Sequence, residues 1–82
     1  MEFKRTDRLL ITRGGILFDQ ARIRFVEETG DGRILHLVSV HRDPNTHYAI
    51  GEDPHDGYAW KELARDALER QFMPDVLILE KI

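Results

Sequence analysis

The four histidines come closest, by residue type and spacing, to forming a chemical site. They fall within twenty consecutive residues, at positions His36, His41, His47 and His55. Zinc needs three or four converging imidazole or carboxylate ligands, and a cross-strand pair of His41 and His47 would supply two, with His55 a further candidate. No metal-binding spacing such as HExxH is present. We therefore expect no bound metal and no cofactor, and a metal-dependent hydrolase using the His36 to His55 cluster is the third-ranked function.

Residues for covalent catalysis are scarce. The chain has no cysteine, and its one serine, Ser39, is expected in the middle of a strand rather than on a sharp strand-to-helix turn. The pair Gly14-Gly15 lacks the lysine and the following helix of a phosphate-binding loop. We therefore expect a protein that is not an enzyme.

Arginines supply the second candidate chemistry. Arg22 and Arg24 alternate along an expected strand, so both should lie on one face and could meet phosphate groups. Proteins that bind single-stranded nucleic acid interleave such charges with stacking aromatic rings, and Phe25 is expected on the opposite, buried face. His36 is expected there too, opposite Phe25, as a hydrogen-bonded core histidine. Nucleic-acid binding is therefore the second-ranked function.

The strands that would position these residues form an antiparallel meander. Residues 8–13 are one strand, Asp19-Gln20 is a turn, and residues 21–41 form a hairpin around Thr29 to Gly32. In the expected register Glu28 faces Arg33, Phe25 faces His36, Ile23 faces Val38 and Ala21 faces Val40. The other face of that hairpin then carries Arg22, Arg24, Val26, Leu35, Leu37 and Ser39. A short fourth strand follows over residues 46–50.

The last third of the chain predicts one helix and one strand. Apolar residues recur at helical spacing between Asp56, a possible cap, and Pro74, a stop: Trp60, Leu63, Ala64, Ala67, Leu68 and Phe72. Residues 76–79 are apolar throughout, as in a strand buried on both faces. The expected fold is α+β, a two-layer domain in which a meander of three to four strands precedes one amphipathic helix and a C-terminal apolar strand.

Composition bounds the class of protein. The 82 residues are 41% hydrophobic and 33% charged, which suits one globular domain over residues 1–82. The net charge of −3 is uneven: residues 1–42 hold eight Lys and Arg against six Asp and Glu, and residues 43–82 hold four against nine. With no cysteine and no long apolar run, we expect a cytoplasmic protein with no membrane partner.

Protein interaction is the leading hypothesis. A single helix covers one face of a sheet, so the arginines and leucines of the other face would form a surface for a second copy or a larger protein. The acidic loop with Glu52 and Asp53 would extend it. Together these features favour a small acidic inhibitor or regulator, of the kind encoded by phages and mobile elements, acting as a homodimer or on a larger protein target.

Overall fold

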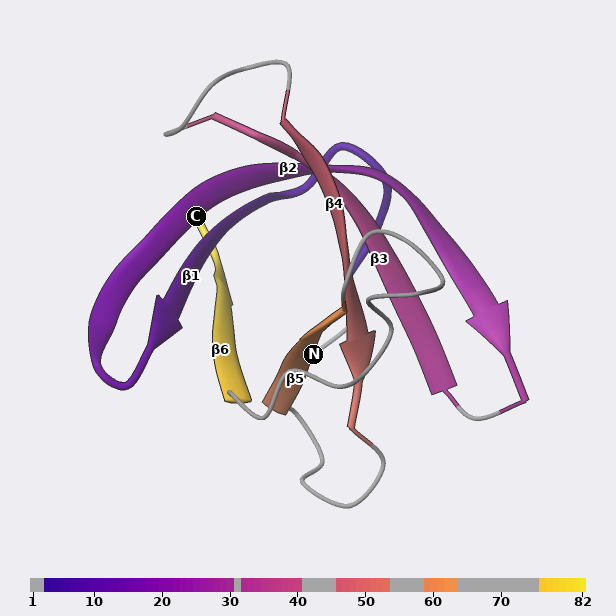
Figure 1. Cartoon of the computed structure of the whole chain (residues 1–82). Coiled ribbons are helices and arrows are strands. Elements are labelled where there is room, and N and C mark those ends of the chain that lie inside the picture. Colours follow the sequence, from indigo (N-terminus) through magenta and orange to yellow (C-terminus); the bar gives the residue numbers. More distant parts are fainter. Residues whose placement is uncertain (1–2, 31, 41–45, 54–58, 64–75) are drawn as a thin grey trace.

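The fold is a closed antiparallel β-barrel in which each strand pairs with the next along the chain (Figure 1). It was obtained as a computed structural model, which describes residues 3–30, 32–40, 46–53, 59–63 and 76–82. In this part of the chain the strands are β1 (Arg8–Arg13), β2 (Ile16–Thr29), β3 (Gly32–Ser39), β4 (His47–Glu52), β5 (Ala59–Leu63) and β6 (Val76–Lys81). The barrel closes where β6 pairs with β1, with Leu79 opposite Ile11. Among the described residues every strand therefore has a neighbour on each side, and the part of β2 beyond Arg22 pairs with β3 alone.

The barrel interior is filled by alternate apolar side chains from every strand. Side chains of a strand point to its two faces in turn, so every second residue enters the core. The buried apolar residues are Phe3, Leu9, Ile11, Ala21, Ile23, Leu35, Leu37, Ile50, Trp60, Leu77 and Leu79. Phe3, from the segment before β1, meets the Trp60 ring edge-on, with ring centroids 5.8 Å apart. Phe3 thus belongs to the core although it lies outside the strands.

The predicted α+β, two-layer class is wrong, because the described residues form an all-β barrel and include no helix. Trp60, expected near the start of a helix, lies in β5 and is 1% exposed. Its strand completes the pairing of β4, with Trp60 opposite Glu52, and of β6, with Trp60 opposite Leu77. Pairing on both sides overrides the helical spacing at this end of the predicted helix. Residues 64–75, which hold the rest of the predicted helix, lie outside the described residues.

Strand β2 also differs from the prediction. The strand over residues 8–13 is confirmed, but the turn expected at Asp19-Gln20 is wrong, since β2 runs unbroken through both residues. Asp19 is fully buried, and its carboxylate accepts hydrogen bonds from Ser39 Oγ at 2.9 Å and Tyr48 Oη at 2.5 Å. A buried carboxylate is costly unless it is hydrogen-bonded, and these two donors satisfy it. These two hydrogen bonds link β2, β3 and β4 through their side chains.

The β2–β3 register is as predicted near the turn and shifted beyond it. Glu28 lies opposite Arg33 and Phe25 opposite His36, which confirms that part of the prediction. Past a β-bulge between Ile23 and Phe25 the partners change: Ile23 faces Leu37 instead of Val38, and Ala21 faces Ser39 instead of Val40. The bulge reverses which side chains point inward on one side of it.

Candidate nucleic-acid interface

The bulge in β2 places two neighbouring side chains on the outer surface. Ile23 and Phe25 pair with consecutive residues of β3, Leu37 and His36, so Arg24 is the extra residue. In such a bulge two residues of one strand oppose a single residue of the other. Ile23 turns into the core, whereas Arg24 and Phe25 are both exposed, Phe25 by 44%. The predicted core positions of Phe25 and of His36 are therefore wrong.

Phe25 is the centre of a stack on this outer surface. The His36 ring lies nearly parallel to the Phe25 ring, with centroids 4.2 Å apart and an angle of 14° between the planes. The Arg24 guanidinium carbon lies over the Phe25 ring, 5.7 Å from its centroid. His36 Nε2 is 2.9 Å from Glu27 Oε1, which fixes the imidazole plane. Phe25 is thus in contact with both the His36 ring and the Arg24 guanidinium.

The segment before β1 forms the opposite wall of this region. Backbone hydrogen bonds join it to β2: Thr6 N donates to Ile23 O, and Ile23 N donates to Asp7 O, each at 2.9 Å. Thr6 has a φ of 74°, a left-handed conformation that a β-branched residue rarely adopts. The tight turn at Thr6 holds Arg5 and Thr6 beside the bulge.

Asp7 stabilises that turn. Its Oδ2 accepts a hydrogen bond from Lys4 N at 2.9 Å and forms an ion pair with Lys81 Nζ at 3.2 Å. The backbone N–H of Lys4, and after it the hydrogen bond and charge of Lys81, hold the pKa of Asp7 below the ordinary value for aspartate. The ionised carboxylate therefore links the N-terminal turn to the last strand of the barrel.

Between the N-terminal turn and the bulge lies a hollow of about 450 Å³, which we call the arginine hollow. It is lined by Arg5, Thr6, Arg22, Ile23, Arg24 and Phe25. Arg8, which is not part of this lining, occupies the position directly opposite Arg22 across β1 and β2. Within the described part of the chain, no carboxylate pairs with Arg5, Arg22 or Arg24. The hollow therefore combines several unneutralised cations with one exposed aromatic ring.

The predicted surface of arginines and leucines is not formed. Arg22 and Arg24 are exposed, but Leu35 and Leu37 are both 0% exposed and point into the barrel. Val26 is half-buried and packs against the same core. The prediction continued a regular register through Arg24, and the bulge removes that regularity.

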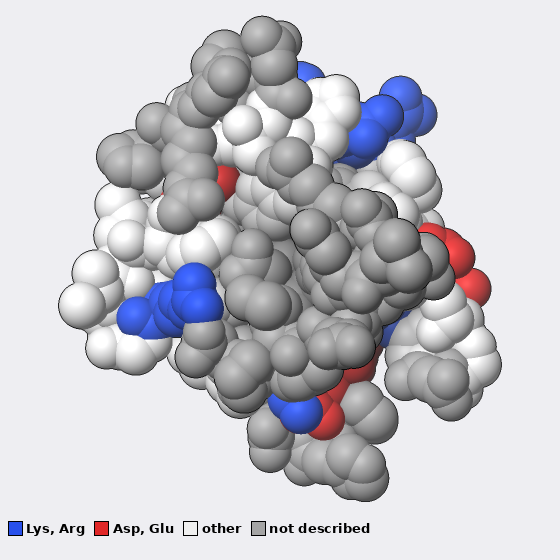
Figure 2. Space-filling model, viewed as in Figure 1, with Lys and Arg blue, Asp and Glu red and all other residues white. Residues whose placement is uncertain are grey.

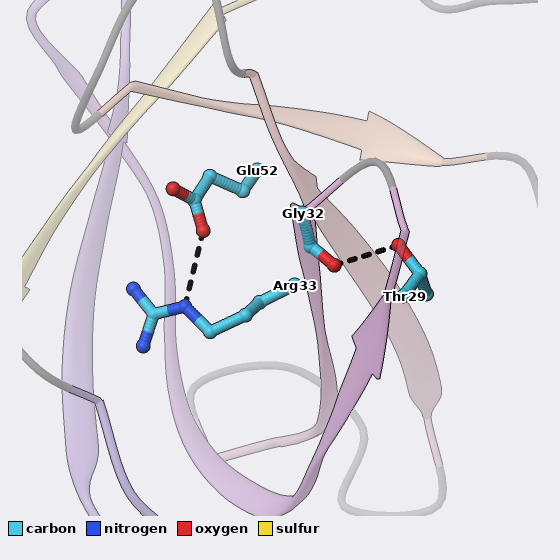
Figure 3. Close-up of polar contacts among 4 residues, drawn as sticks. All are labelled: Thr29, Gly32, Arg33 and Glu52. Carbon is cyan, nitrogen blue, oxygen red and sulfur yellow. Dashed lines mark hydrogen bonds and ion pairs between the residues drawn. The ribbon is translucent and has the colours of Figure 1, made fainter.

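The two predicted acidic residues are engaged within the molecule. Figure 3 shows Glu52 at the end of β4 reaching Arg33, whose Nε lies 3.0 Å from Glu52 Oε2. Beside them Thr29 Oγ1 donates to Gly32 O at 2.6 Å and closes the β2–β3 turn. Asp53 is buried, with Lys61 Nζ 2.7 Å from its Oδ2. These carboxylates have internal cationic partners.

The histidines do not converge in the described residues. His47 is exposed on β4 opposite Val38, and His36 contacts Phe25 and Glu27. His41 and His55, the other weak metal candidates, lie outside the described residues. No group of three His, Cys, Asp or Glu that could hold a metal occurs among the residues described.

Positive charge is local on the face of the molecule that Figure 2 shows. On the face seen in Figure 2, Lys and Arg side chains stand in separate groups and do not form one continuous basic surface. This agrees with a net charge of −3. An anionic ligand would therefore be attracted by a particular group of arginines and not by the field of the whole protein.

Sequence reasoning singled out Arg22 and Arg24 but missed Arg5, Thr6, Phe25 and His36 as their neighbours. The available signal was the run Arg22-Ile23-Arg24-Phe25, in which an aromatic residue directly follows the second arginine. Regular alternation along the strand puts the Phe25 ring on the face opposite to Arg22 and Arg24. Only an extra residue in the strand brings the ring to the same face as the arginines.

The chain matches no protein-family model, no curated protein and no solved structure. In the part that the structure describes, no helix is long and apolar enough to span a membrane. The arginine hollow is therefore the feature of the described residues from which a function can be inferred.

Proposed function

We propose that the protein binds nucleic acid through the arginine hollow. The observation that carries the proposal is the bulge at Arg24, because it places an exposed phenylalanine among three arginines that line one hollow. Guanidinium groups bind phosphate through paired, charge-assisted hydrogen bonds, and aromatic rings stack on bases. These are the two contacts that a nucleic acid offers.

In the free protein neighbouring arginines repel one another, and a bound anion would relieve this repulsion. Arg8 and Arg22 occupy directly opposite positions on neighbouring strands, and like charges so placed destabilise a sheet. Arg24 and Arg5 add to the same local repulsion. A phosphate bound among them would replace repulsion with attraction, which supports an anionic ligand for this surface.

The hollow sets the expected strength of binding. With three guanidinium groups lining it and a net negative protein around it, affinity should be modest and sensitive to salt. Three phosphate contacts predict a slope of about −2 to −3 for log affinity against log salt, at about 0.7 to 0.9 per contact.

Fluorescence anisotropy of a labelled oligonucleotide in low-salt buffer tests the proposal. Arg22→Gln and Arg24→Gln should each weaken binding by about 5-fold and make the salt slope shallower by about 1. Arg13→Gln is the matched control, since it removes the same charge from the other end of β1 and should change affinity by less than about 2-fold. No binding at low salt, or an equal loss in the control, would contradict the proposal.

A protein-interaction function is the second candidate, favoured by a different observation. Leu17 and Ile78 both lie opposite Thr12, on either side of β1, and are 43% and 50% exposed. Ile16, at the β1–β2 turn, is 73% exposed. Neighbouring exposed apolar side chains are typical of surfaces that contact other proteins. Sedimentation of the wild type and of Ile78→Glu would detect self-association through this surface.

A further inference from the structure

We infer that the arginine hollow selects single strands, because one unpaired base stacks on Phe25 while the arginines hold the flanking phosphates. The inference rests on the proposed nucleic-acid function and specifies its ligand. It follows from the way in which Phe25 is supported, exposed and surrounded.

Phe25 has the properties of a stacking platform. One side of its ring is backed by the His36 imidazole at 4.2 Å, and Glu27 holds that imidazole through Nε2. With both His36 and Arg24 in contact with it, Phe25 is still 44% exposed. Since Phe25 already has these contacts, a base that stacks on it orders little else.

Arg24 covers the ring in the free protein but can be displaced. Its contact with the ring, at 5.7 Å, is on the surface, and such a cation–π contact is worth about 2- to 5-fold in an equilibrium constant. A base stacked on an aromatic side chain is worth about 5- to 150-fold. Exchanging one for the other therefore favours the base, and the displaced guanidinium becomes available to a phosphate.

The size and walls of the hollow suit one nucleotide. Its volume of about 450 Å³ falls within the range of small-ligand pockets, about 300 to 1,000 Å³. Arg22 lies on β2, two residues before Arg24, and Arg5 comes from the segment before β1. A nucleotide whose base reaches Phe25 would thus have arginines from two segments of the chain near its backbone.

A duplex cannot use the same contact. Its base faces are covered by neighbouring base pairs, so exposing one to Phe25 would require unstacking and unpairing. A duplex can still meet the arginines through its phosphates. Single strands and duplexes should therefore share the arginine contacts and differ in the Phe25 contact.

The test compares one labelled single strand, the same strand annealed to its complement, and the same strand carrying abasic sites, all at one low salt concentration. The intact single strand should bind about 10-fold more tightly than either of the other two. Phe25→Leu should remove this difference while leaving duplex binding within about 2-fold, and Phe25→Tyr should restore it. Thermal melting of each variant checks that the barrel is folded, and the abasic strand tests stacking without any change to the protein.

The outcomes separate the two proposals. Equal binding of the intact strand, the abasic strand and the duplex, all weakened by Arg22→Gln, would overturn the stacking inference and leave nucleic-acid binding in place. Absence of binding to all three would overturn both. Loss of duplex binding in folded Phe25→Leu would also overturn the inference, since Phe25 would then act on something that both ligands share.

Discussion

Two arginines on the β2–β3 hairpin have the same type of aromatic neighbour and different surroundings. Arg33 lies 5.8 Å from the Trp60 ring centroid and pairs with Glu52, and its side chain is 23% exposed. Arg24 lies 5.7 Å from the Phe25 ring centroid and is exposed. Among the described residues it has no carboxylate partner. An arginine that has its own carboxylate stabilises the fold, whereas one that shares a hollow with other cations is available to an anion.

The aromatic partners differ in the same way. Trp60 is 1% exposed and belongs to the barrel core, so Arg33 covers a ring that no ligand can reach. Phe25 is exposed and belongs to no core cluster. The comparison therefore separates a structural arginine region, around Arg33, from a ligand-binding one, around Arg24. Three predictions test this separation and the strand geometry on which it depends, in order of expected effect.

Leu37→Glu should unfold the protein. Leu37 is fully buried opposite Ile23, and an unpaired carboxylate there would cost more than about 4 kcal/mol of unfolding free energy, most of the stability of a domain this small. Val38→Glu changes the next residue, which points outward, and should cost about 1 kcal/mol or less. Circular dichroism with urea denaturation measures both. A folded, stable Leu37→Glu would show that the hairpin faces are assigned the wrong way round.

Arg33→Gln and Arg22→Gln should affect stability differently. Arg33→Gln leaves the half-buried Glu52 without its ion pair and should lower the free energy of unfolding by about 1 kcal/mol. Arg22→Gln relieves repulsion with Arg8 and should be neutral, or stabilising by about 0.3 kcal/mol. Urea denaturation at low salt compares them. Equal losses would mean that the two regions are not distinct.

The smallest effect should come from Asp7 and depend on pH. Because its pKa is lowered in the folded protein, its contribution to stability is complete above the ordinary aspartate pKa and is lost as the pH falls through the lowered value. Thermal melts of Asp7→Asn should therefore depend less on pH in that acidic window than wild type does. The same variant should weaken oligonucleotide binding slightly at neutral pH, since the turn that carries Arg5 loses its ion pair with Lys81 and keeps only a weaker, neutral hydrogen bond from Lys4 N. Identical pH profiles would contradict this role.

The parts of the fold that sequence reasoning identified are those with strong local patterns. The strand at residues 8–13 and the pairing of Glu28 with Arg33 follow from apolar alternation and a glycine-containing turn. The strand at Trp60 could not be found in this way, because its short segment also fits a helical spacing. Closure of a barrel is a tertiary event: β5 is a strand because β4 and β6 both need a partner.

For a similar reason, the sequence predicted only the arginines of β2 in the candidate site and missed their neighbours. Arg22 and Arg24 were identified by residue type, but their partners depend on one extra residue in β2. The sequence does not mark this bulge, because position 24 is an arginine and not a glycine. Arg5 and Thr6 reach the hollow through backbone hydrogen bonds to Ile23, which carry no signature in side-chain pattern. The same bulge that hid Phe25 from the prediction also took Leu35 and Leu37 out of the predicted surface.

The most direct test of the central claim is NMR chemical-shift mapping of the isotope-labelled protein during titration with short oligothymidylate. The account predicts that the largest shifts fall on the lining of the arginine hollow and on His36, behind Phe25, while the amides of Arg33 and Trp60 stay unchanged. Shifts centred on Arg33 and Trp60, or on Ile16 and Leu17 at the β1–β2 turn, with Arg22 to Phe25 unmoved, would contradict it.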